Sequence, residues 1–146
     1  MPFHFPLAAV LRFRESIEQR EHLALETIQR DISRVELRIR EVEEADNAAT
    51  KIRTDDLAHG KRAASMQSEY QHQSSLARQR EGFESLLQEL KIKWRQQLAA
   101  YQLARRNRET LEKLRENQLD AYTREQNKRE QAVIDDIFLS RRGRHK

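Results

Sequence analysis

The sequence is poor in residues that interrupt or cross-link secondary structure, because its 146 residues include no cysteine, two prolines and three glycines. The lack of cysteine excludes a disulfide framework, a thiolate metal site and a cysteine nucleophile. So few turn-forming residues exclude a fold of many short strands. No apolar run approaches the roughly 18 residues of a transmembrane helix, and the N-terminus lacks a signal-peptide pattern. We therefore expect an intracellular protein with no segment inserted into a membrane.

Apolar residues are also scarce, at 37% of the chain, whereas charged residues reach 36%. Average domains contain about 45–50% apolar and about 25% charged residues. A thick core is therefore excluded, which leaves either disorder or long helices that each bury one narrow stripe. The abundance of alanine, glutamate, leucine, lysine and arginine favours the helices. The net charge of +4 is too small for a polybasic nucleic-acid-binding tail.

A first helix is predicted over residues 7–58, starting after Pro6, whose missing N–H costs nothing at the first helical position. Its apolar residues recur at spacings of three and four, which is the heptad repeat of a coiled coil. These residues are Leu25, Ile28, Ile32, Val35, Ile39 and Val42. Upstream, the seam continues in a shifted phase through Leu7, Val10, Ile17 and Ala24. Arg14 and Glu21 stand where apolar residues are expected, so we expect imperfect packing in the first third.

A turn is predicted over residues 59–65, where His59-Gly60-Lys61 offers a left-handed C-cap. Ser65 and Ser68 are candidate N-caps of a second helix over residues 66–139, which a basic tail follows over residues 140–146. The seam of this helix is Leu76, Phe83, Leu87, Leu90, Trp94, Leu98, Tyr101, Ala104, Arg108 and Leu111, and then more sparsely Leu114, Leu119, Tyr122, Val133 and Ile137.

Two long helices and one short turn predict an all-α fold, a long antiparallel two-helix coiled-coil hairpin that forms a single domain over residues 1–146. With the turn centred near residue 62, the numbers of paired residues sum to about 124. Leu7 then lies near Asn117, and the second helix continues for about twenty residues, or roughly 30 Å. A lone helix of this length is marginal in water. This projecting C-terminal helix therefore either frays or binds a partner.

The pattern offers no catalytic chemistry. A two-helix hairpin presents a ridge, whereas catalysis needs several groups fixed in a concave pocket. The five histidines show no i, i+4 pair that would indicate a zinc site, and the carboxylates have Arg or Lys at helical spacing. We therefore predict a protein that is not an enzyme, with no catalytic residue, no cofactor and no metal.

A basic run in the second helix is the strongest local charge feature. It comprises Arg105, Arg106, Arg108, Lys113 and Arg115, and three interleaved glutamates reduce its sum to +2. Nucleic-acid binding needs a denser, one-sided patch with a recognisable reading motif, so we predict no nucleic-acid partner. The run is either a solvated helix face or a surface for an acidic protein partner.

Three segments carry a resemblance to a known family. They are FHFPLAAVLRFRESIEQRE at residues 3–21, ARRNRETLEKLRE at residues 104–116 and YTREQNKREQAVIDDIFLSRR at residues 122–142. Within them, Phe3 and Phe5, residues 11–15, the LEKLRE block and the closing Asp135-Asp136-Ile137 match the family pattern. On these motifs the chain resembles the FliJ family of flagellar export proteins over nearly its whole length.

This resemblance implies a coiled-coil stalk, similar to the central stalk of the rotary ATP synthase, that binds and activates the hexameric export ATPase. It also implies contact with the export gate, which is a membrane protein, and escort of export chaperones. The protein then lies in the cytoplasm, peripheral to the cytoplasmic face of the cell membrane at the flagellar base, and supports flagellum assembly, motility and chemotaxis. The expected ATPase-binding residues are Arg105, Arg106, Arg108, Lys113, Arg115, Leu119 and Tyr122. Tyr70 and Leu76 are expected to be exposed gate contacts near the turn.

Two alternatives remain open at this stage. One is the corresponding stalk of an injectisome type III secretion system, which has the same mechanics. The other is a structural tether or oligomeriser whose seam completes a homodimer or a four-helix bundle. A homodimer at low concentration favours the tether, whereas an elongated monomer favours the stalk.

Overall fold

The computed structural model describes residues 2–60 and 63–144, and these residues form two long helices that pack against each other. Helix α1 spans Ala8–Ala58 and helix α2 spans Ala63–Arg144. The predicted first helix therefore matches α1 to within one residue. Helix α2 begins three residues earlier and ends five residues later than predicted, so Ser65 and Ser68 lie inside it and the N-cap prediction is wrong. Lys61, His145 and Lys146, which belong to the predicted C-cap and basic tail, lie outside the described residues.

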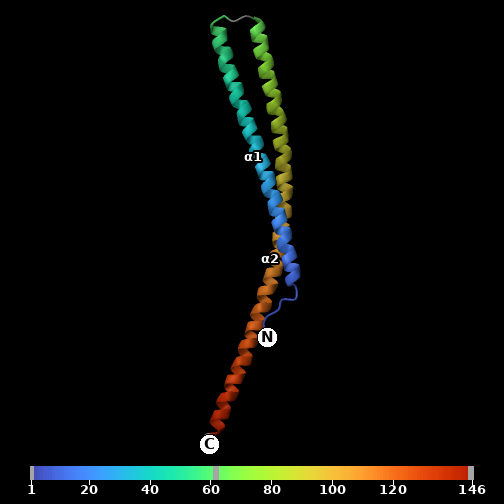
Figure 1. The fold of residues 1–146 in the computed structure, drawn as a ribbon, viewed down its shortest axis with the longest axis vertical. Helices are drawn as coiled ribbons and strands as arrows, with labels where there is room; N and C mark the ends of the chain where they lie inside the picture. The colour runs from blue at the N-terminus through green and yellow to red at the C-terminus, as the bar shows by residue number, and fades with distance from the viewer. Residues whose placement is uncertain (1, 61–62, 145–146) are drawn as a thin grey trace. The chain divides into compact units, whose positions relative to one another are not determined.

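The chain divides into two compact units, and each helix contributes to both. The turn unit is Arg20–Tyr101, and the terminal unit combines Met1–Gln19 with Gln102–Lys146. In the turn unit α1 and α2 run side by side, with the connection near Gly60 (Figure 1). Gly60 has a φ of 72°, in the left-handed region that glycine adopts without a steric penalty. The sequence therefore places its C-cap glycine where the backbone requires one.

The core of the turn unit is the predicted heptad seam. Ile32, Val35 and Leu90 are buried in one cluster. Five half-buried side chains pack against that cluster: Ile28, Ile39, Phe83, Leu87 and Trp94. Val42 and Leu76 are buried as well. The seam prediction is thus confirmed in this unit, and one narrow apolar stripe per helix supplies the burial that a thick core supplies elsewhere.

Contacts between the helices of the turn unit reveal their register. Arg80 lies 3.0 Å from Glu43, and Gln73 donates a hydrogen bond of 3.0 Å to Thr50. Both pairs lie within one position of the predicted register. As residue numbers fall along α2 they rise along α1, so the two helices are antiparallel within this unit.

The terminal unit begins with a short extended segment before α1. Phe5 is only 4% exposed, and its carbonyl accepts a hydrogen bond of 3.1 Å from the amide of Ala8. Leu11 is buried, whereas Leu7 and Val10 are exposed. The predicted seam is therefore wrong at Leu7 and Val10, whereas its members Ile17 and Ala24 are half-buried. Leu11 lies three heptads before Ile32 and therefore shares its heptad position, whereas Val10 does not.

Candidate partner-binding surfaces

The basic run divides into residues that are engaged within the chain and residues that face solvent. Arg105 forms an ion pair of 2.8 Å with Glu109 on the next turn of α2. Arg106, Lys113 and Arg115 are exposed, and they form no ion pair within residues 2–60 and 63–144. Arg106 and Lys113 line one shallow hollow of about 470 Å³ together with Glu109, Thr110, Glu112 and Glu116. The surface available to a partner is therefore mixed in charge.

Arg108 differs from the rest of the run because it lies in the seam. Its guanidinium makes a bidentate contact with the carboxylate of Glu18 on α1, in which Nη2 donates over 3.2 Å. It also donates over 2.6 Å to Glu112. The side chains of Arg108 and Glu18 are only 20% and 17% exposed. The hydrogen bond to Glu18, and then the charges of Glu18 and Glu112, raise the pKa of Arg108 above its ordinary value.

This geometry changes the role that can be assigned to Arg108. A bidentate pair between opposite helices fixes which residue faces which. Arg108 therefore positions α2 on α1 within the terminal unit, and it is not an exposed contact like Arg106. Sequence reasoning missed Glu18, although stepping back two heptads from Ile32 through Leu25 reaches it.

The turn unit also has polar contacts at its seam, in the part nearest Tyr101. The amide of Gln97 donates to the backbone carbonyl of Glu21 over 2.9 Å and to its carboxylate over 2.6 Å. The rings of His22 and Tyr101 lie 5.5 Å apart, tilted by 54°. The sequence predicted imperfect apolar packing at Glu21, and the structure shows that a glutamine on the opposite helix satisfies this carboxylate.

The N-terminal segment covers part of the predicted ATPase-binding surface. The rings of Phe3 and Tyr122 lie 5.6 Å apart, so Tyr122 is half-buried by its own chain. Leu119 remains 37% exposed. The covered part of α2 thus extends beyond Asn117, where the sequence-based register ended it.

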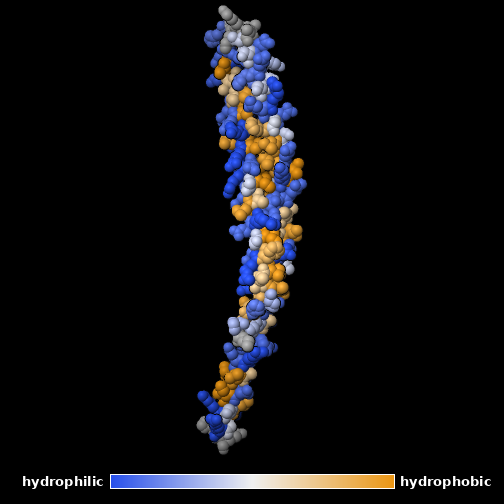
Figure 2. Space-filling view, turned by 45° about the vertical axis from the view of Figure 1, so that its right-hand side comes forward, coloured by the Kyte–Doolittle hydropathy of each residue, from blue (hydrophilic) through white to orange (hydrophobic). Residues whose placement is uncertain are grey.

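All residues from 127 to 144 of α2 are exposed. Within this stretch Val133, Ile134, Ile137 and Phe138 recur at the i, i+1, i+4, i+5 spacing that places them on one helical face. We call these four residues the C-terminal stripe. They are 50–63% exposed, and an apolar cluster is visible near the C-terminal end of α2 (Figure 2). An exposed apolar face of this kind is a candidate interaction surface.

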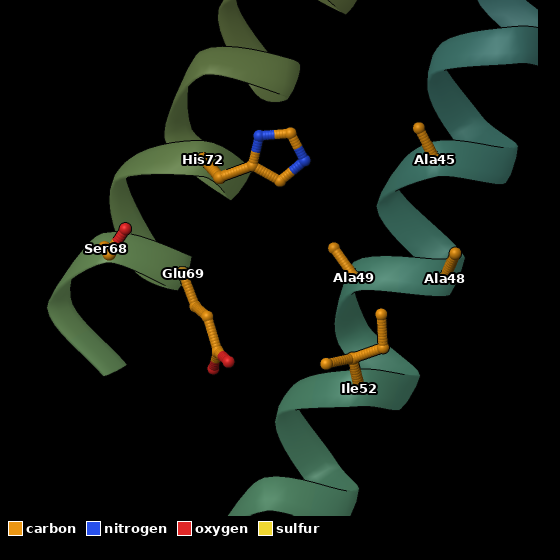
Figure 3. A pocket seen from close by; sticks show the side chains of 7 residues that line it. All are labelled: Ala45, Ala48, Ala49, Ile52, Ser68, Glu69 and His72. Atoms are coloured by element: carbon orange, nitrogen blue, oxygen red, sulfur yellow. The ribbon is translucent and has the colours of Figure 1, made fainter. Parts of the chain in front are cut away.

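A second concave surface lies between α1 and α2 of the turn unit (Figure 3). It is a groove of about 410 Å³ lined by Ala45, Ala48, Ala49, Ile52, Ser68, Glu69 and His72. The side chains of Glu69 and His72 project from α2 toward the alanines of α1 (Figure 3). We call it the alanine groove.

The two predicted gate-contact residues have opposite environments. Tyr70 is 66% exposed, as expected. Leu76 is only 6% exposed, so the prediction that it is exposed near the turn is wrong. Leu76 stands one heptad from Phe83 and faces α1 for the same reason that Phe83 does. Whether Tyr70 touches a membrane protein remains a prediction.

Within residues 2–60 and 63–144, neither helix has a stretch long and apolar enough to cross a membrane. In the described part of the chain, no group of three or more His, Cys, Asp or Glu side chains could hold a metal ion. The two concave surfaces described above are open to solvent.

Comparison with known proteins agrees with these observations. The family model described as "Flagellar FliJ protein" matches residues 3–146. No curated protein and no solved structure matches the chain significantly. The family match includes the N-terminal aromatic residues, the Arg108 region and the C-terminal stripe. Because the match spans almost the whole sequence, this chain belongs to the FliJ family of flagellar proteins.

Proposed function

We propose that this protein is a coiled-coil component of flagellar protein export that binds and activates the export ATPase ring through the C-terminal part of α2. Family membership supports a role in export. The observation that carries the ATPase contact is the C-terminal stripe, an apolar face that no described residue covers. In this proposal the C-terminal part of α2 projects from the two-helix hairpin and inserts into the ring.

The stripe fits a helix-in-groove contact. In this mode an amphipathic helix places residues three or four positions apart, on one face, into an apolar groove of its partner. Val133 and Ile137 are one turn apart, and so are Ile134 and Phe138. Asp135 and Asp136 fall on the opposite face of the helix. The partner therefore contacts one side of α2 only, as a ring lining or a cleft does.

The exposed part of the basic run supplies the second contact of this proposal. Arg106, Lys113 and Arg115 face solvent on α2, and they extend the contact toward an acidic surface of the ATPase. Rim charges of this kind affect the association rate and its salt dependence more than the affinity. Leu119 contributes an apolar contact between these charges and the stripe.

The same proposal includes the roles that family resemblance implies for the rest of the chain. The turn unit links the ATPase to the export gate, with Tyr70 as its exposed aromatic contact, and the protein escorts export chaperones. It acts without catalytic chemistry of its own, at the cytoplasmic face of the membrane. Its loss impairs flagellum assembly, and hence motility and chemotaxis.

The test is ATP hydrolysis and hexamer content of the cognate export ATPase, measured with and without the purified protein. We expect both to rise with the wild-type chain. Ile137→Asp places a charge in the stripe and is expected to remove most of this rise. The matched control is Leu139→Asp, which introduces the same charge at a position that is also exposed but lies outside the stripe. Wild-type protein without any effect on the ATPase refutes the proposal.

The basic contact is tested separately by the double variant Arg106→Glu with Lys113→Glu. We expect a slower association with the ATPase and a weaker salt dependence, with unchanged helicity, because exposed charges contribute little to folding. A charge reversal at Lys91 and Lys93, which are exposed in the turn unit, serves as control. Equal effects of the two double variants refute a specific basic contact.

A further inference from the structure

The alanine groove arises because the seam of the turn unit loses its large side chains near the turn. Ala49 occupies the heptad position that the buried Val42 holds seven residues earlier, and Glu69 occupies the position that the buried Leu76 holds seven residues later. Small and polar residues cannot fill the space between two helices as valine and leucine do. The seam is therefore open where Ala45, Ala48 and Ile52 line it.

The groove has an apolar floor, and the α1 segment beside it is acidic in composition. Residues 41–58 of α1 contain six acidic and two basic residues, and Glu69 adds a carboxylate on the α2 side. Glu41 and Glu43 are paired with Arg38 and Arg80, and Asp56 and Glu69 also have interactions within the chain. An occupant that complements this surface is apolar on one face and basic at its edge.

The C-terminal stripe has both of these properties. Its four apolar side chains lie on one face of α2, and Arg141 follows on that same face one turn after Ile137. Arg142 and Arg144 add further positive charge at the end of the helix. Asp135 and Asp136 lie on the far side, where they do not oppose the acidic rim.

We propose that the C-terminal stripe of one copy docks into the alanine groove of a second copy. Helix α2 carries both the stripe and the Glu69 side of the groove, so the stripe that enters the groove comes from another chain. The charges are opposite in sign, because a basic helix end meets an acidic rim. The free protein covers in this way the same apolar face that is proposed above to contact the ATPase.

The contact is weak, and it allows further copies to add to the assembly. A stable interface buries about 800 Å² per partner, and one stripe of four side chains offers less than this. The two surfaces differ from each other, so the contact is head-to-tail and each added copy presents a new groove. The average mass therefore grows with concentration beyond a dimer, and it falls in salt.

The first experiment is sedimentation of the free chain over roughly a hundredfold range of concentration. We expect the average mass to rise above the 17.4 kDa of the monomer. Ala48→Lys places a long, positively charged side chain in the groove, and is expected to weaken association at least about tenfold. Asn47→Lys is the matched control, since it adds the same charge beside the groove without lining it. Phe138→Asp and Leu139→Asp form the corresponding pair for the stripe.

The second experiment uses the absence of cysteine, which makes single-cysteine variants unambiguous. Ser68→Cys and Ile134→Cys are mixed and oxidised, and the proposal predicts disulfides between the two variants in excess over those within either variant. A mass independent of concentration overturns the proposal. So does association that both Ala48→Lys and Phe138→Asp leave intact, or cross-linking mainly within one variant. No ATPase is present, so these outcomes do not depend on the proposed export function.

Discussion

The contact between Glu18 and Arg108 allows a quantitative test of the seam. At the 3.2 Å separation of Nη2 and the carboxylate, the gross attraction of two unit charges is about 5 kcal/mol for an effective dielectric constant of about 20. Desolvation offsets most of this, because both side chains are about four-fifths buried. The net value therefore lies between that of an exposed pair and that of a fully buried one.

We predict that Arg108→Met lowers the free energy of unfolding by about 2 kcal/mol. Exposed pairs contribute about 0.2–1 kcal/mol, whereas removing one member of a fully buried pair costs about 3–5 kcal/mol. Methionine retains the aliphatic packing and leaves the Glu18 carboxylate without its main partner. The measurement is urea unfolding followed by circular dichroism. The variant and the wild type are compared with the same m value, which is the slope of the unfolding free energy against urea concentration.

Two further variants distinguish the loss of the Glu18–Arg108 contact from a nonspecific effect of substitution on stability. The double variant Glu18→Leu with Arg108→Met makes this layer apolar, and we expect it to recover all or more of the lost stability. Arg38→Met breaks an exposed pair with Glu41, and we expect a change below about 0.5 kcal/mol. If Arg108→Met lies within 0.5 kcal/mol of the wild type, or if the double variant is less stable than the single one, the reasoning is refuted.

Three other predictions concern the turn unit and use the same unfolding assay. Ile32→Ala, in the buried cluster, is expected to cost about 2–4 kcal/mol, whereas Ile92→Ala at an exposed position costs less than about 1 kcal/mol; equal costs contradict the assigned seam. Gly60→Ala is expected to destabilise by about 1 kcal/mol, because alanine is strained at a φ of 72°; no loss contradicts a left-handed Gly60. Gly82→Ala is expected to stabilise by about 0.5–1 kcal/mol, because an added Cβ meets nothing within 4 Å in the helix interior; a loss shows that this site is more crowded than the structure indicates.

The sequence predicted the seam of the turn unit because apolar residues of similar size repeat there without interruption. Between Leu25 and Val42 each step of three or four leads to another apolar residue, and the structure buries that stripe. The turn was predictable for a similar reason, since Gly60 stands between two helical patterns. Local chemistry and periodicity agree in this part of the chain.

The terminal unit was harder to predict because its seam contains charged residues. A search for apolar positions selects Val10, whereas Leu11 is the buried residue, and the half-buried positions include the charged Glu18 beside Ile17. Nothing in the sequence of α1 alone indicates that Glu18 faces Arg108, because the pair joins residues 90 positions apart. The cover that Phe3 provides for Tyr122 is equally long-range.

The exposed end of α2 is better explained as a binding surface than as a solvated helix. A helix that evolved only to be soluble has no reason to place apolar residues on one face, yet four of the five large apolar residues in 127–144 share one face and the two aspartates lie on another. An isolated helix of this length is marginal in water because nucleation is costly. Here the covered part of α2 is already helical, so the helix does not have to be nucleated again at its C-terminal end. This end can therefore stay helical while it presents the stripe. The same continuity means that charge placed on the stripe tests binding without first abolishing the helix.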